Sequence, residues 1–256
     1  MPYLYFDESI RDDGLFIVGA LVESKIDLSP TVRDAWRAMG KNPDVFEYKS
    51  SAPKASDPLS QKQRAVLLGL LQSCRLALVI CARDDRSRLG EHCLALILQL
   101  LDTGHLKPDQ YTLFLDQGIS VSNLSKAAIA ARGVTVEGNR DSRIIAGIQV
   151  ADHAAHVLGI TLREEIGLSK KTIIVGVEVG YDPPVEIELG YELWAGLRYS
   201  FYGMDDEISE TSAEEGRVDR HRKVQGHGLY IAPSCNSALY EHSLRCFGLI
   251  YLGCIH

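Results

Sequence analysis

The feature that most constrains this fold is an unbroken apolar run from Leu76 to Ala82. A run of this length with no polar interruption is typical of a strand that is covered on both faces of a sheet. Two more strands are predicted near the N-terminus, over residues 3–7 and 14–22. The polar link between them has turn chemistry, which favours an antiparallel hairpin.

Helices and strands alternate after this hairpin. Apolar residues recur at helical spacing, so we predict helices over residues 29–39, 60–74, 88–101, 122–132 and 143–160, with strands at 111–116 and 134–136 and a short extended piece at 45–49. Such an alternation is typical of a mixed β-sheet flanked by helices, and the predicted fold class is α/β.

The pattern weakens beyond residue 165. We predict a strand over residues 173–177 and a helix over 191–201. Residues 205–228 are acidic and then basic with little apolar content, which predicts a mobile loop. The predicted organisation is therefore an α/β domain over residues 1–165 and a C-terminal extension, 166–256, that packs on it.

Composition limits the possible partners. The net charge is −7, with 34 acidic and 27 basic residues, which argues against general coating of nucleic acid. A nuclease remains possible, because acids that bind metal make a site negative until cations fill it. The basic residues cluster twice, as is typical of solvated surface: Arg83, Arg86 and Arg88, then Arg217, Arg220, Arg222 and Lys223.

Localisation is predicted from what the sequence lacks. None of the six cysteines forms a C-x-x-C pair, and those at 74, 81 and 93 lie in apolar runs, as reduced core thiols do. There is no charged leader followed by an apolar stretch and no apolar run long enough to span a membrane. We therefore expect a cytoplasmic protein with no membrane partner.

Acidic residues stand at the edges of several predicted core elements. Asp7 and Glu8 are expected to end the first strand, where they point to opposite faces, and both faces are apolar, so the pattern leaves open which of them enters a site. Asp116 ends the strand 111–116, at the carboxyl edge where open α/β sheets place their sites. Gln149 and Asp152 are three residues apart on a helix and share a face.

A second group of candidates lies between the first two predicted helices. Glu47 stands between two aromatic residues, an unusual place for an acid on a plain surface. Lys49 would share its face along an extended chain and could contact a phosphate or help to position a nucleophilic water. His156 follows Asp152 by four residues and could join the site, although histidines at such positions more often pack in a core or lie on the surface.

The chemistry of these residues favours a hard divalent cation. Buried charges are costly unless they are paired or bind metal. Carboxylate oxygens suit Mg²⁺ and Mn²⁺, and two such ions about 4 Å apart can activate water and stabilise the leaving oxygen of a phosphodiester. Each acid also has an ordinary structural interpretation, as part of a turn, a helix cap or an ion pair.

The sequence resembles the uncharacterised family catalogued as domain of unknown function 3800, whose members are similar to the ribonuclease H-like fold. The resemblance rests on Asp7-Glu8-Ser9, on the Gly-containing second strand and on Gln149-Val150-Ala151-Asp152, with similar pieces at Glu47–Ser51 and Leu115-Asp116. It implies a ribonuclease H-like sheet with catalytic acids at Asp7, Glu47, Asp116 and Asp152. The match spans about residues 3–160 and gives the C-terminal extension no role.

The function that these observations favour is a metal-dependent phosphodiester hydrolase, a nuclease acting on nucleic acid with Mg²⁺ or Mn²⁺. Asp7, Asp116 and Asp152 are the predicted metal ligands, Glu47 completes the catalytic set, and Lys49, Gln149 and Glu8 are the predicted substrate-binding residues. Two alternatives stay open: a non-catalytic ribonuclease H-like binding module, and a hydrolase of nucleotides or other small phosphoesters.

Overall fold

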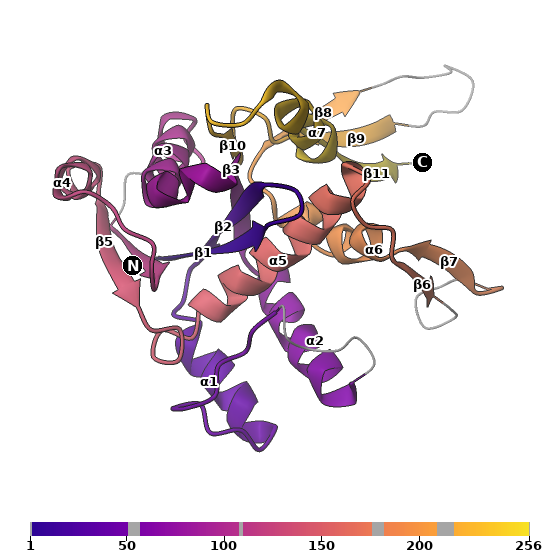
Figure 1. Ribbon diagram of the computed structural model, residues 1–256, viewed down its shortest axis with the longest axis horizontal. Helices are drawn as coiled ribbons and strands as arrows, with labels where there is room; N and C mark the ends of the chain where they lie inside the picture. The colour runs from indigo at the N-terminus through magenta and orange to yellow at the C-terminus, as the bar shows by residue number, and fades with distance from the viewer. Residues whose placement is uncertain (1, 51–56, 108–109, 176–181, 209–217, 256) are drawn as a thin grey trace.

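A six-stranded mixed sheet forms the centre of the molecule (Figure 1). The computed structural model describes residues 2–50, 57–107, 110–175, 182–208 and 218–255. The strand order is β10-β3-β2-β1-β4-β5, with antiparallel pairing of β1 with β2 and of β2 with β3, and parallel pairing elsewhere. The strands are β1 (Tyr3–Arg11), β2 (Phe16–Ser24), β3 (Arg75–Ala82), β4 (Tyr111–Asp116), β5 (Val134–Arg140) and β10 (Leu229–Ile231).

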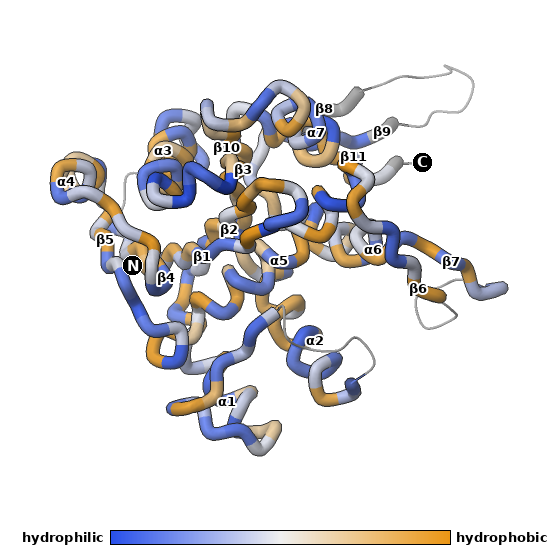
Figure 2. Tube along the Cα trace, in the orientation of Figure 1, coloured by the Kyte–Doolittle hydropathy of each residue, from blue (hydrophilic) through white to orange (hydrophobic). Residues whose placement is uncertain are grey.

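Helices cover both faces of this sheet, as the unbroken apolar run in β3 predicts. The helices are α1 (Ser29–Ala38), α2 (Pro58–Gln72), α3 (Leu89–Asp102), α4 (Asn123–Ala130), α5 (Ile148–Glu165), α6 (Leu189–Ala195) and α7 (Ser237–Phe247), with short 3₁₀ turns η1 (Arg83–Arg88) and η3 (Arg198–Ser200). Buried residues of α1, α2, α5 and α7 form one core with the sheet, and those of α3 and α4 form the other. Hydrophilic and hydrophobic segments alternate along α2 in Figure 2, as expected for a helix with one buried face.

The long helix α5 crosses the sheet directly over the first strand. A Cβ added at Gly147, just before the helix, would lie 2.3 Å from the ring of Tyr5, and one at Gly159 would lie 2.6 Å from the Arg11 guanidinium. The two glycines therefore let the helix approach β1 more closely than a larger side chain would allow. The start of the helix lies against Tyr5 and a later turn lies against Arg11. The helix and the strand therefore run in the same direction.

The first strand is longer than its sequence predicts. Its pairing with β2 continues to Arg11, which is opposite Phe16, and the turn is confined to residues 12–15. Asp7 and Glu8 therefore lie in the middle of β1, and the prediction that they end the strand is wrong. The polar residues after Glu8 do not stop the strand, because β2 supplies backbone partners along its whole length.

The C-terminal part of the chain carries more strand than expected. The loop predicted over residues 205–228 is wrong in part, since β8 (Met204–Ile208) and β9 (Val218–Lys223) pair with each other, and residues 209–217 lie outside the described residues. These two strands and β11 (Leu249–Ile255) form a three-stranded sheet. Strand β10 lies at the edge of the main sheet beside β3, so one segment after residue 165 contributes to the central sheet. The division of the chain at residue 165 stays a prediction.

Other differences are local. The piece at 45–49 forms no strand, the helix predicted from residue 143 begins at Ile148, and the helix predicted over 191–201 is divided into α6 and η3. The strand predicted at 173–177 is β6 (Thr172–Val175) within the described residues, paired with β7 (Val185–Glu188). Within the described residues, every helix is too short or too polar to cross a bilayer.

Candidate active site

Two of the predicted acids come together on adjacent parallel strands. In the register of β1 with β4, Tyr5 is opposite Phe114 and Phe6 is opposite Leu115. The rings of Tyr5 and Phe114 stack at 5.7 Å on the face that α5 covers. Asp7 and Asp116 each follow by two residues and point to the same face, because strand side chains alternate. Neighbouring strands are about 4.8 Å apart, so the two carboxylates lie close together.

Helix α5 brings the third acid to the same level. Gly147 packs on Tyr5, and Asp152 is five residues further along, about 7.5 Å at 1.5 Å per residue. The same distance along β1, at about 3.3 Å per residue, covers about two residues and ends at Asp7. The charges of Asp116 and Asp152 both raise the pKa of Asp7, in agreement with this geometry.

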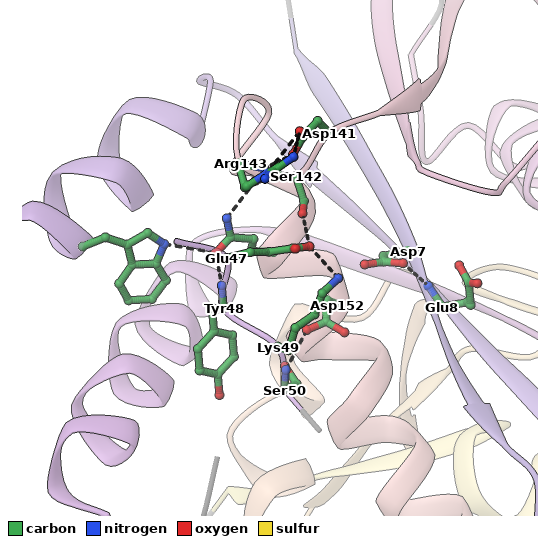
Figure 3. Close-up of polar contacts among 12 residues, drawn as sticks. Asp7, Glu8, Glu47, Tyr48, Lys49, Ser50, Asp141, Ser142, Arg143 and Asp152 are labelled. Atoms are coloured by element: carbon green, nitrogen blue, oxygen red, sulfur yellow. Dashed lines mark hydrogen bonds and ion pairs between the residues drawn. The ribbon is translucent and has the colours of Figure 1, made fainter. Parts of the chain in front are cut away.

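The fourth acid is carried by an irregular segment, residues 46–50, that Gln149 fixes in place. The Gln149 side-chain oxygen accepts hydrogen bonds from the Trp36 indole (3.0 Å) and the Tyr48 backbone N–H (3.1 Å). Its amide nitrogen donates to the Ser142 carbonyl at 2.7 Å. Figure 3 shows Tyr48 and Ser142, whose backbones make two of these contacts. Gln149 is only 1% exposed, and the prediction that it binds substrate stays a prediction.

Glu47 and its neighbours face the Asp152 carboxylate from this segment (Figure 3). The Glu47 carboxylate accepts a hydrogen bond from the Ser142 hydroxyl and pairs with Lys49 Nζ at 2.5 Å. The Ser50 backbone N–H donates to Asp152 Oδ2 at 3.0 Å. The segment is therefore tied both to α5 and to the turn before it, and the structure brings Glu47, Lys49 and Asp152 together.

The pKa values of the three aspartates in the cluster are all raised. Burial raises the pKa of Asp7 well above its usual value, and the charges of Asp116, Asp152 and Glu8 add to this effect. Burial also raises the pKa of Asp116 to about 6, helped by Glu8 and Glu47 and opposed by the Gln117 backbone N–H and Lys49. The pKa of Asp152 is raised in the same direction by burial.

Lys49 supplies positive charge to the cluster from within. Burial acts to lower its pKa, but the hydrogen bond and charge of Glu47, with the charges of Asp116 and Asp7, outweigh burial and raise it. Its side chain is about half exposed, at 51%, so the ammonium group reaches the cluster from the solvent side. The net charge of the four acids and this one base is strongly negative when all are ionised.

Glu8 points to the opposite face of the sheet from Asp7. Its Oε1 pairs with Arg86 Nη2 at 2.9 Å, and its Oε2 is buried with no hydrogen-bond partner among the described residues. This answers the question that the sequence left open, because only Asp7 faces α5. Glu8 still acts on the cluster through its charge, which raises the pKa of both Asp7 and Asp116.

The histidines on α5 are packing residues. Burial, with the nearby charge of Arg64, lowers the pKa of His153 to about 4. Burial also lowers the pKa of His156 to about 3, and its backbone carbonyl accepts a hydrogen bond from Arg11 at 2.7 Å. Both imidazoles are neutral near pH 7, and the suggestion that His156 joins the acids is not supported.

The donor set suits a hard divalent cation in its chemistry. Asp7, Asp116 and Asp152 offer carboxylate oxygens, which Mg²⁺ and Mn²⁺ prefer, and burial raises the pKa of each of them. Within the described ranges, no three His, Cys, Asp or Glu side chains stand in a geometry ready to hold a metal ion. These residues therefore fit a divalent cation in charge and in donor type. The aspartate side chains would have to rotate to complete a coordination shell.

Sequence reasoning missed the residues that hold the site from the turn after β5. Asp141 follows this strand directly and forms an ion pair with Arg143 at 2.5 Å, and Ser142 holds Glu47. Both are visible in Figure 3 above the carboxylates. The available signal was position, since β5 runs parallel to β4 and its carboxyl end lies at the same edge of the sheet as Asp116.

Comparison with known proteins gives little further information. No protein-family model matches the chain, so the resemblance to the domain of unknown function 3800 rests on its short motifs alone. No curated protein matches it either. Among solved structures, a chain of the PCNA:RNase HII complex from Archaeoglobus fulgidus is similar at 15% identity and a TM-score of 0.39, over 65% of this chain and 79% of that chain. A likeness this weak carries no argument about activity.

Proposed function

We propose that the chain is a metal-dependent phosphodiester hydrolase, a nuclease that uses Mg²⁺ or Mn²⁺ and acts on nucleic acid. The observation that carries the proposal is the meeting of Asp7, Asp116 and Asp152, which come from three separate elements, on one face of the sheet. Burying carboxylates together is costly unless a cation compensates them. The same set of elements supplies the acids that the ribonuclease H-like resemblance implies.

The residues of the cluster divide naturally into roles. Asp7, Asp116 and Asp152 would hold the cations, which when bound activate water and neutralise charge on the phosphodiester. Glu47 is held by Ser142 and Lys49, so its carboxylate is oriented to accept a proton from the attacking water. Lys49 is half exposed and reaches the site from solvent, which suits contact with a substrate phosphate.

Two hydrogen bonds hold these catalytic groups in place. Gln149 fixes the backbone at Tyr48, and the Ser50 N–H orients the Asp152 carboxylate. A misplacement of about 1 Å in such a site lowers the rate by about a hundredfold. Loss of Gln149 should therefore lower activity without removing any group that contacts the substrate.

A second candidate function is a non-catalytic binding module. It is favoured by Lys49, which already supplies positive charge within the cluster, and by the absence of a ready metal geometry within the described residues. In this case the acids would serve only the fold. The two functions differ in whether the protein binds a divalent cation at these residues.

Metal titration and cleavage assays separate the two. We expect calorimetry to show Mn²⁺ binding to the wild-type protein and its loss in Asp7→Asn and Asp152→Asn, with loss of Mn²⁺-dependent cleavage of DNA or RNA oligonucleotides. Asp34→Asn is the matched control, because this acid is 71% exposed on α1 and its one ion pair among the described residues is with Arg37, at 2.5 Å. Undiminished cleavage by Asp7→Asn would refute the assignment, and no binding at millimolar Mn²⁺ would favour the non-catalytic module.

A further inference from the structure

A polar pocket lies at the end of the sheet away from the acid cluster. Its volume is about 320 Å³, and its walls include Glu23 at the end of β2, Arg75 at the start of β3, and Lys25. A neighbouring pocket of about 290 Å³ shares these three residues. Together they have the size of a site for a small molecule, for which pockets of roughly 300–1,000 Å³ are usual.

This pocket is separate from the candidate active site. Glu23 is opposite Arg75 in the register of β2 with β3, and Leu21 and Ala77, two residues away on each strand, pack in the core under α3 and α4. The pocket therefore opens on that face, whereas Asp7 faces α5. Asp7 is paired with Ala20, which is three residues, or about 10 Å, from Glu23 along β2.

Two cations in the pocket wall are free to bind an anion. Lys25 and Arg75 are both exposed, and neither forms an ion pair with any of the described residues. Both line the two pockets, so they stand where the pockets meet. Exposed cations that share a concave wall and form no ion pair there are suited to charge-assisted hydrogen bonds with a phosphate.

The acids in the same wall already have partners. Glu23 accepts a hydrogen bond from the Tyr202 hydroxyl. Asp205 is held by Arg222 through two contacts of 2.5 and 2.9 Å. The hydrogen bond and charge of Arg222 lower the pKa of Asp205, and the charges of Arg220 and Arg75 lower it further. Glu23 and Asp205 together therefore offset only part of the positive charge of the wall.

Arg222 of β9 also lines this pocket. Arg222 also donates to the carbonyls of Tyr199 and Phe201 at 2.8 and 3.1 Å, so its guanidinium is a rigid part of the wall. Burial lowers the pKa of His105 in the same wall, and the charges of His227, Arg75 and Arg222 lower it further. His105 is thus neutral near pH 7, and its Nε2 forms a hydrogen bond with His227 Nδ1 at 3.0 Å.

We infer that this pocket binds a small phosphate-bearing anion through Lys25 and Arg75, independently of the acid cluster on the other face. A phosphomonoester carries a charge of about −1.5 to −2 at neutral pH, and it would meet a wall in which the cations Lys25, Arg75 and Arg222 outnumber the carboxylates Glu23 and Asp205. The pocket would hold the phosphate group between them, and the adjoining pocket would take the rest of an ester.

Calorimetric titration at constant ionic strength tests this inference. The probes are inorganic phosphate and adenosine 5′-monophosphate, added to the full chain. We expect the double variant Lys25→Gln/Arg75→Gln to bind the better probe at least tenfold more weakly than the wild type. Tighter binding of the nucleotide identifies an ester as the ligand class, and equal binding identifies free phosphate.

Controls separate this site from general charge effects and from the proposed function. Lys62→Gln removes one exposed charge from α2 and should leave the affinity unchanged, as should Asp7→Asn in the acid cluster. The double variant should keep the wild-type unfolding midpoint, since neither side chain forms an ion pair within the described residues. No binding of either probe by the wild type, or a loss smaller than tenfold in the double variant, overturns the inference.

Discussion

Replacement of Asp116 by asparagine should stabilise the metal-free protein at neutral pH. In the folded protein, burial with the charges of Glu8 and Glu47 raises the pKa of Asp116 from 3.8 to about 6. A carboxyl group whose pKa is higher in the folded than in the unfolded state favours folding when protonated and opposes it when ionised. Asparagine has the same shape and carries no charge.

The size of the effect follows from this pKa. One pKa unit corresponds to about 1.4 kcal/mol, so a rise from 3.8 to about 6 corresponds to about 3 kcal/mol of lost stability above pH 6. The Asp116 carboxyl group is partly exposed, and screening by solvent lowers the expected gain of Asp116→Asn to about 2 kcal/mol at pH 7.5. Below pH 3.8 both side chains are neutral and the gain should vanish.

Urea unfolding in the presence of EDTA measures this difference at a series of pH values. The free energy of unfolding of Asp116→Asn should exceed that of the wild type at pH 7.5, and the difference should shrink as the pH falls from 6 to 4. Excess Mn²⁺ should remove the advantage, because it binds only the wild-type site well and stabilises the folded state. A difference that does not change with pH, or a variant less stable than the wild type in EDTA at pH 7.5, would refute the electrostatic reasoning.

Three further predictions concern the framework of the site. Gln149→Leu should lower the free energy of unfolding by about 2–4 kcal/mol in urea titrations, because it leaves two buried N–H donors without their acceptor, and a loss below about 1 kcal/mol would contradict this. Gly147→Ala should cost about 1–3 kcal/mol in the same assay, since the new methyl group would meet the Tyr5 ring, and an unchanged midpoint would show that α5 can move away freely. Lys49→Met should raise Mn²⁺ affinity measured by calorimetry while it lowers cleavage, because the cation that competes at the acids also contacts the phosphate, whereas weaker Mn²⁺ binding would show that Lys49 does not compete.

Local pattern was sufficient for most elements of the main sheet. The hairpin of β1 and β2, the buried strand β3, strand β4 ending at Asp116, and the amphipathic helix α5 all follow from apolar periodicity and turn chemistry. Asp116 is predicted as a candidate because the end of an apolar run is visible in sequence. Asp152 is predicted because its apolar neighbours recur at helical spacing.

Long-range pairing determined what the pattern missed. β8 and β9 are rich in charged residues and have no apolar alternation, so only their mutual backbone pairing makes them strands. β1 extends past its acids for the same reason, since β2 provides partners as far as Arg11. Sequence periodicity carries no information about such partners, because a strand needs another strand to satisfy its backbone groups.

The sequence by itself determined that this chain builds a covered α/β sheet and that acids stand at the edges of its core elements. The tertiary structure decided which of these acids share a face, since Asp7 points towards α5 and Glu8 points away from it. It also buried Gln149, whose side chain accepts a hydrogen bond from the Tyr48 backbone. The physical reason is that strand register and the close approach of α5 at Gly147 set these directions. Both depend on contacts between segments that are more than a hundred residues apart in the chain.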